Sequence, residues 1–337
     1  MADGTSGPPR GASRQGAGVV AGYAGGELLA EVVRSGFVEG YHRGSVVVLD
    51  AAGQAVAAAG DATGPIFPRS SNKPLQAVGM LRAGFAPAEA SHLALAAASH
   101  FGEDFHISGV REILRAAALP TGALACPPDL PLATDARDAV LRAGGGPERI
   151  YMNCSGKHAA MLATCVAAGW PTAGYRDPAH PLQERLASTV AELAAEPVAA
   201  TGVDGCGAPV LAFSLLGLAS AYLCLVHAAP GTAERRVADA MRAYPLLVSG
   251  TGGDDALLMQ GVPGLLAKGG AEGVLAVAVP EVGAVALKID DGGLRARVPV
   301  LVSALRRLGV DAPALGELGE VAVLGGGEVV GAVRSLW

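Results

Sequence analysis

The sequence predicts an α+β domain in which strands from both ends of the chain share one sheet around a helical middle part. Three observations predict this fold class. The β-branched run 46–48 lies near the N-terminus, two short apolar runs at 274–279 and 282–289 lie near the C-terminus, and helical spacing dominates from 75 to 242. Strands and helices segregated along a chain are typical of α+β domains. With 337 residues, the chain can bury a core without disulfide bonds.

The expected elements follow in chain order. Residues 1–18 are Gly, Ser, Pro and Ala with scattered charges, which predicts a disordered leader, and order is expected to begin near Val19 in a single domain over 19–337. Residues 44–61 predict two strands joined by a turn at 51–53. The helical part, about 75–245, is followed by the apolar strands named above, a helix over 294–308 and a last strand over 328–333.

Composition and charge exclude some partners. Lys and Arg number 25 against 31 Asp and Glu, and basic residues occur in runs of at most two, so we expect no nucleic-acid partner. Residues 205–226 are 22 residues without a charge, long enough to span a membrane. Glycines, a proline and serines interrupt this segment, so we predict a continuous buried core helix only over 210–226 and no membrane partner.

The cysteines indicate a reducing compartment. Five cysteines are odd in number and widely spaced, which is typical of free thiols rather than a disulfide framework. The first residues show no basic segment followed by an apolar one, as a secretory signal would. We therefore expect a cytoplasmic protein.

The first segment that could carry chemistry is Pro68-Arg69-Ser70-Ser71-Asn72-Lys73-Pro74. A serine attacks an amide only when a base removes its proton, and a lysine one helical turn away can do so as a neutral amine. Bringing the pKa of a lysine from about 10.4 to about 7 requires roughly 5 kcal/mol, which calls for burial or a second cation nearby. The alternative is a helix-capping serine with an exposed lysine. The proline also disfavours helical backbone at the preceding residue.

Two further segments offer a serine and a lysine. Ser99 is adjacent to His100, so the two cannot share a helix face, and Ser99 either needs a distant partner or only ends a helix. Lys268 precedes Gly269 and Gly270, where the backbone can approach a substrate closely. The alternative for Lys268 is an exposed loop lysine.

Two glycine-rich turns each carry a cysteine at the start of an expected helix. They are Asn153-Cys154-Ser155-Gly156-Lys157-His158 and Gly202-Val203-Asp204-Gly205-Cys206-Gly207. A helix N-terminus stabilises a thiolate, and two thiolates with a nitrogen ligand and a water form an open tetrahedral zinc site. Buried free cysteines, or a nucleophilic cysteine with His158 or His100 as its base, remain alternatives.

Taken together, these segments resemble the rhizobial-type, serine/lysine class of L-asparaginases, the asparaginase II family. The matching stretches follow one another over nearly the whole chain after residue 19: 42–44, 68–76, 98–103, 153–158, 173–178, 202–207, 267–273 and 288–292. The resemblance implies a fold like that of penicillin-binding proteins, serine β-lactamases and glutaminases. It implies a catalytic domain that converts L-asparagine to L-aspartate and ammonia, and a homodimer is expected.

The resemblance also implies roles for individual residues. The catalytic pairs are Ser70 with Lys73 and Ser99 with Lys268, and two neighbouring ammonium groups lower each other's pKa. Substrate binding falls to Arg69, His158 and Asp204. Zinc, structural or orienting the substrate, is held by Cys154, Lys157 and Cys206.

Several neighbouring polar positions depart from the family pattern. Glycine stands at 40, phenylalanine at 101 in place of a serine, and proline and aspartate at 127 and 129, where a histidine is lost. Gly253 and Ala256 replace an arginine and a threonine. Polar groups that pair with the ends of a ligand set specificity, so hydrolytic chemistry is more firmly predicted than the substrate. Another small amide, or acyl transfer to an amine, is the alternative, and so is a binding protein without activity.

Overall fold

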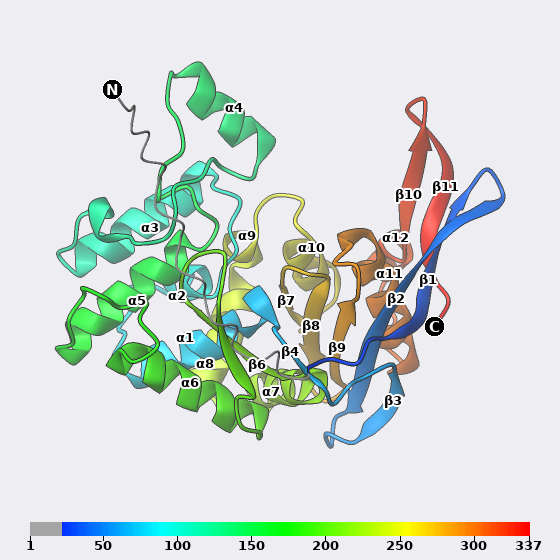
Figure 1. Ribbon diagram of the computed structural model, residues 1–337, viewed down its shortest axis with the longest axis horizontal. Helices are drawn as coiled ribbons and strands as arrows, with labels where there is room; N and C mark the ends of the chain where they lie inside the picture. The colour runs from blue at the N-terminus through cyan, green and yellow to red at the C-terminus, as the bar shows by residue number, and fades with distance from the viewer. Residues whose placement is uncertain (1–21) are drawn as a thin grey trace, which may run out of the picture.

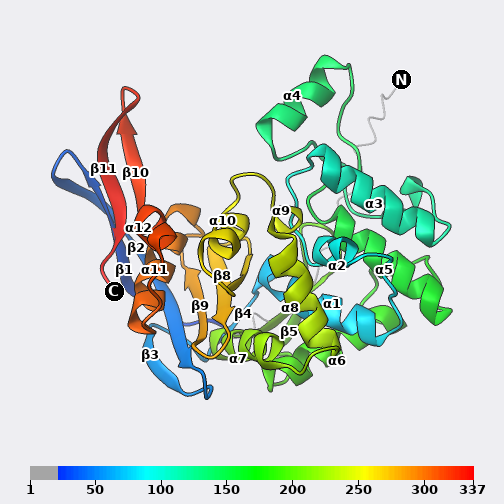
Figure 2. The same ribbon diagram turned by 180° about the vertical axis from the view of Figure 1, so that it is seen from behind.

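The computed structural model describes residues 22–337, and Figures 1 and 2 show a sheet on one side of the molecule and a group of helices on the other. The predicted leader, 1–18, and the expected start of order near Val19 lie outside the described residues. The predicted α+β class is confirmed.

The main sheet is antiparallel and combines strands from both ends of the chain. Its order is β10 (Glu320–Gly325), β11 (Glu328–Ser335), β1 (Glu27–Arg34), β2 (Phe37–Asp50), β9 (Gly283–Ile289), β8 (Val274–Val279) and β7 (Leu266–Gly269), with β3 (Ala55–Ala59) paired to β2. Ala30 pairs with Ser335, and Gly44 pairs with Ile289. The predicted sharing of one sheet by both chain ends is therefore confirmed, and Lys268 lies on the edge strand β7.

Helices cover both faces of the central strands. Every residue of β8 is buried, and because successive side chains point to opposite faces, this requires cover on both sides. α7 (Leu215–His227) and α11 (Arg297–Arg307) both pack on β8 and β9. The predicted strands over 274–279 and 282–289 and the helix over 294–308 are confirmed, although a 3₁₀ turn, Leu294–Ala296, precedes α11.

The remaining helices form the other side of the molecule (Figure 1). They are α1 (Lys73–Arg82), α2 (Ala90–Ala96), α3 (Asp104–Ala116), α4 (Thr134–Arg142), α5 (Ser155–Ala168), α6 (Pro181–Ala194), α8 (Ala233–Ala243), α9 (Pro245–Val248) and α10 (Asp254–Gly261), with α12 (Pro313–Leu318) beside α11. α1 packs against α5, α6 and α8, so the helix that begins at Lys73 lies inside this group.

One helix prediction is wrong in its first part. Within 210–226, only the residues from 215 onward are helical, and Pro209–Ser214 forms β6 between β4 (Pro65–Ile66) and β5 (Ala200–Val203). The Ser214 hydroxyl accepts a hydrogen bond from Gly217 N at 2.9 Å, which caps α7 and ends the strand. No helix among residues 22–337 is both long and apolar enough to cross a membrane.

Candidate active site

A cavity of about 380 Å³ brings together residues from distant parts of the sequence. Its polar lining includes Ser70, Ser99, Asn153, Asp255, Lys268 and Arg297. Three of the four predicted catalytic residues thus line one cavity, and the fourth, Lys73, lies beside Ser99.

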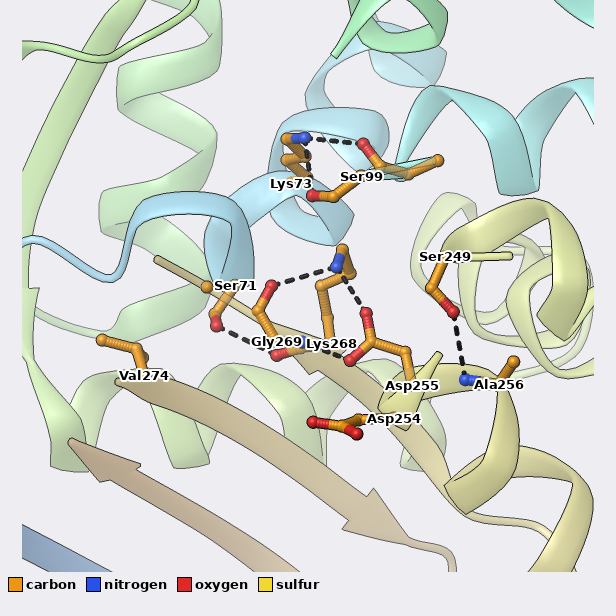
Figure 3. Close-up of polar contacts among 12 residues, drawn as sticks. Ser71, Lys73, Ser99, Ser249, Asp254, Asp255, Ala256, Lys268, Gly269 and Val274 are labelled. Carbon is orange, nitrogen blue, oxygen red and sulfur yellow. Dashed lines mark hydrogen bonds and ion pairs between the residues drawn. The ribbon is translucent and has the colours of Figure 1, made fainter. Parts of the chain in front are cut away.

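The turn that carries Ser70 is fixed against β7 and α7. A 3₁₀ turn, Arg69–Asn72, leads into α1, and Arg69 has a φ of 53°, a left-handed conformation that costs a non-glycine residue energy. Ser71 Oγ donates to Lys268 O at 2.9 Å, and Tyr222 Oη donates to Ser71 O at 2.7 Å (Figure 3 shows the first of these). These two bonds hold Ser70 at the cavity.

Lys73 begins α1 despite the proline that follows it. Its backbone is helical, with φ −60° and ψ −36°, and Pro74 is tolerated in the first turn because an N–H there would have no partner within the helix. The expected conflict between Pro74 and a helical Lys73 is therefore resolved in favour of the helix. The Lys73 side chain extends into the interior, where the residue is 1% exposed.

The Lys73 amine contacts Ser99 and a cysteine. Its Nζ donates to Ser99 Oγ at 2.9 Å, to Ala98 O at 2.6 Å and to Cys154 Sγ at 3.0 Å. Figure 3 shows Lys73 pointing toward Ser99. The hydrogen bonds thus pair Lys73 with Ser99, whereas the sequence prediction paired it with Ser70.

Lys268 is paired with a carboxylate rather than with Ser99. Its Nζ lies 2.5 Å from Asp255 Oδ2 and donates to Gly269 O at 3.0 Å, with both charged groups buried (Figure 3). Burial lowers the pKa of Lys268; Asp255 opposes this and Lys73 adds to it. Burial alone would raise the pKa of Asp255, but Lys268 and Arg297 lower it. Asp255 therefore stays ionised and holds the lysine as an ion pair.

The two predicted zinc-binding cysteines lie in one buried cluster. Contact with Cys154 lowers the pKa of Cys206, and contact with Cys206 together with burial raises the pKa of Cys154. Lys157 Nζ donates to Cys206 Sγ at 3.4 Å. Burial would lower the pKa of Lys157, but the two cysteine sulfurs raise it. The shifts of Cys206 and Lys157 therefore both favour their charged forms, which lie next to each other.

These residues fit zinc in their donor chemistry. Two sulfurs and an amine are predicted ligands, and the buried His158 Nε2 beside them has no hydrogen-bond partner of good geometry among the described residues. Soft sulfur and nitrogen donors are those that zinc prefers. Within 22–337, no three His, Cys, Asp or Glu side chains already converge as metal ligands do, so Lys157 is needed to complete the set.

The predicted substrate-binding residues fall into two places. Arg69 Nε donates to Asp204 Oδ1 at 2.7 Å, and a second nitrogen of Arg69 lies 3.7 Å from Glu272. His158 is instead in the cysteine cluster, where its Nδ1 lies 2.7 Å from Tyr175 Oη and burial lowers its pKa to about 4. The structure thus joins Arg69 to Asp204 by a hydrogen bond and places His158 in the cysteine cluster.

Among the positions that depart from the family pattern, Phe101 and Gly253 line the cavity. Ala256 lies just behind it, where its N–H donates to Ser249 Oγ at 3.2 Å (Figure 3). Asp129 instead forms a β-bridge with Glu148, and Gly40 lies in β2. Phe101 and Gly253 are therefore the replacements that alter the cavity surface.

Sequence reasoning assigned no role to three residues of this site, namely Asn153, Asp255 and Arg297. Asp255 supplies the anion for Lys268, and Arg297 donates to Asp254 Oδ2 at 2.9 Å and to Gly270 O at 3.1 Å. The available signal was an acidic pair, 254–255, directly after the glycines 252–253, at the start of a helix.

Comparison with known proteins gives a family match. The model of the family described as L-asparaginase II matches residues 30–335, while no curated protein matches the sequence. Two solved structures resemble the chain. A crystal structure of Mglu in its native form has a TM-score of 0.43 at 17% identity and covers 79% of this chain. A β-lactamase from Mycobacterium bovis has a TM-score of 0.40 at 14% identity over 79% of this chain and 94% of its own. The chain spans 64% of the length of the Mglu chain.

Proposed function

The chain belongs to the L-asparaginase II family, and from this membership we propose that it is an amidohydrolase that converts L-asparagine to L-aspartate and ammonia. The observation that carries the proposal is the meeting of two serines and two buried lysines at one cavity. Ser70, Ser99 and Lys268 line it, and Lys73 Nζ lies 2.9 Å from Ser99 Oγ.

In the first half of the reaction, Lys73 first loses one of its three ammonium protons to solvent; Ser70 Oγ then attacks the side-chain amide carbon, and the lysine amine takes up the serine proton. Ser99 passes this proton to the departing nitrogen, so the C–N bond breaks and ammonia leaves. The hydrogen bond between Lys73 and Ser99 supports this relay. In the second half, water attacks the acyl-serine and gives one proton to the Lys73 amine, the C–O bond to Ser70 breaks, Ser70 Oγ takes that proton back from Lys73, and aspartate leaves.

Lys268 serves as a fixed positive charge in this scheme. Its ion pair with Asp255 holds the ammonium group at the cavity surface, where it stabilises negative charge that develops on the carbonyl oxygen. This role replaces the pairing of Ser99 with Lys268 that the family resemblance implied, because the amine donates to Asp255 and Gly269 rather than to Ser99.

A second assignment makes Ser99 the nucleophile. The hydrogen bond from Lys73 to Ser99 favours it, because a base must reach the proton that it removes. The two assignments differ in which serine becomes acylated. Mass spectrometry of proteolysed enzyme, quenched during turnover, identifies that serine.

The cysteine cluster would hold zinc through Cys154, Lys157 and Cys206. When bound, zinc would supply a Lewis-acidic positive charge, and its ligands would connect the start of α5 with the 202–207 turn. The cluster reaches the catalytic residues through Cys154, which accepts a hydrogen bond from Lys73. Cys154 therefore helps to orient the Lys73 amine, which is the proposed base. The expected homodimer and cytoplasmic location stay predictions.

The experiment that tests this function is ammonia release from L-asparagine by the purified protein, with and without a chelator. Ser70→Ala is expected to leave a folded protein without turnover. Ser188→Ala, at an exposed serine of α6 that bonds within its own helix, is the matched control and keeps wild-type activity. Wild-type ammonia release from the Ser70→Ala protein would refute the mechanism, and the Ser99→Ala variant then tests the second assignment.

A further inference from the structure

The cavity that holds the two serines also carries large apolar side chains. Phe101, Leu132 and Leu294 line it together with the polar residues, and Leu132 and Leu294 are 41% and 55% exposed. Exposed apolar surface that borders a concave polar site is typical of contact with an apolar part of a ligand. These three residues form what we call the apolar rim.

Hydrogen bonds and close packing hold the apolar rim in place. Ala133 N donates to Phe101 O at 2.9 Å, which fixes the segment with Leu132 beside Phe101. Thr251 N donates to Glu103 Oε2 at 3.0 Å, which attaches the 249–253 loop to the segment that carries Phe101. The backbone at Phe101 and Leu132 is therefore held in place before any ligand binds, and little ordering of these two positions is needed on binding.

The ring of Phe101 occupies the space in which a side chain from the 250–253 loop would lie. A Cβ added at Gly253 would be 3.0 Å from Phe101 Cζ, and one at Gly250 would be 2.6 Å from the same ring. The Phe101 ring therefore fits in this position only because residues 250 and 253 have no side chain. As a result, the Phe101 ring forms the cavity surface at the place where a side chain at position 250 or 253 would otherwise lie.

We propose that the preferred substrate is a primary carboxamide that carries an aromatic or branched aliphatic group, which packs against Phe101 and Leu132. This inference rests on the proposed amidohydrolase function and names its substrate class. Water adds to the carbonyl carbon, the C–N bond breaks, and a carboxylic acid and ammonia form. L-Asparagine carries no apolar group that could pack against Phe101 and Leu132, so it gains nothing from this contact.

The test compares kcat/KM, measured as ammonia release, for 3-phenylpropanamide, propionamide and L-asparagine. The aromatic amide is expected to exceed both others by about tenfold or more, which is the discrimination that an apolar pocket provides. Leu132→Ser and Phe101→Ser should each lower the ratio of the aromatic amide to propionamide by about tenfold. Leu141→Ser, at a leucine of α4 that is 49% exposed, is the matched control and leaves the ratio unchanged.

The outcomes separate this inference from the function on which it rests. Hydrolysis of L-asparagine and propionamide as efficient as that of 3-phenylpropanamide would overturn the substrate class alone. An unchanged ratio in Leu132→Ser would also overturn it, and because this leucine is half exposed, that variant is expected to fold even if Phe101→Ser does not. Absence of ammonia release from every amide by the wild-type protein would overturn both proposals.

Discussion

Replacing Gly270 by alanine tests whether the reactive serine is held in place by close contact between the turn before α1 and the end of β7. A Cβ at Gly270 would lie 2.4 Å from Pro68 O and 3.0 Å from Ser71 Oγ, on either side of Ser70 in the sequence. Ordinary contact begins at 3.4 Å, so the turn must move by about 1 Å to accept the methyl group.

The size of this displacement sets the expected loss of activity. A misplacement of about 1 Å in a catalytic group costs on the order of 10²-fold in rate, while overpacking of a well-packed site costs about 1–3 kcal/mol in the free energy of unfolding. Gly270→Ala is therefore expected to lower kcat for amide hydrolysis about 10²-fold in a protein that still folds.

The assay measures kcat by ammonia release and the free energy of unfolding by urea denaturation. Gly316→Ala, in α12, is the matched control because its added Cβ would meet no atom within 4 Å, and it is expected to keep both values or to gain slight stability. Wild-type kcat in a well-folded Gly270→Ala protein would refute the reasoning, because Ser70 could not then depend on this contact.

Three further predictions concern buried charged groups and the predicted zinc site. Asp255→Asn breaks the buried ion pair and should lower the free energy of unfolding by about 3–5 kcal/mol in urea denaturation. The control Glu39→Gln, in an exposed pair, should lower it by less than about 1 kcal/mol, and equal losses in the two variants would contradict the buried ion pair. Burial lowers the pKa of both His100 and His106, so below about pH 6.5 the unfolded chain binds more protons than the folded one. Lowering the pH should therefore decrease the free energy of unfolding, by up to about 1.4 kcal/mol per pH unit for each ring. Urea midpoints that do not change between about pH 7.5 and 5.5 would refute this. Elemental analysis should find zinc in the wild-type protein and not in Cys206→Ala, and equal zinc in both would exclude the predicted site.

The sequence predicted those parts of the fold that depend on local patterns. The β-branched residues of β2 and the apolar runs of β8 and β9 form strands as expected. Residues 210–214 were assigned to a helix because a short apolar run fits either structure, and pairing with β4 and β5 decides in favour of a strand. Tertiary pairing likewise turns Glu27–Arg34, which was not predicted, into β1 between β2 and β11.

The candidate residues could be found from the sequence, but their partners could not. Ser70, Ser99 and Lys268 meet at one cavity as the family resemblance implied. That Lys73 bonds to Ser99, 26 positions away, and that Lys268 pairs with Asp255 depend on how helices and strands pack. Motif spacing describes only neighbours along one element, so it suggested the pair within one helical turn instead.

The separation of these buried pairs from the apolar rim explains how one site could serve different amides. The ion pair of Lys268 and the hydrogen bonds of Lys73 come from α1, α10 and β7, whereas Phe101 and Leu132 lie on loops between helices. A change in the loops alters which group packs beside the carboxamide without leaving a buried charge unpaired. A change in the buried pairs does leave one, at a cost of several kcal/mol. Substitutions in the rim are therefore expected to change the choice of substrate, and substitutions in the pairs to remove both stability and catalysis.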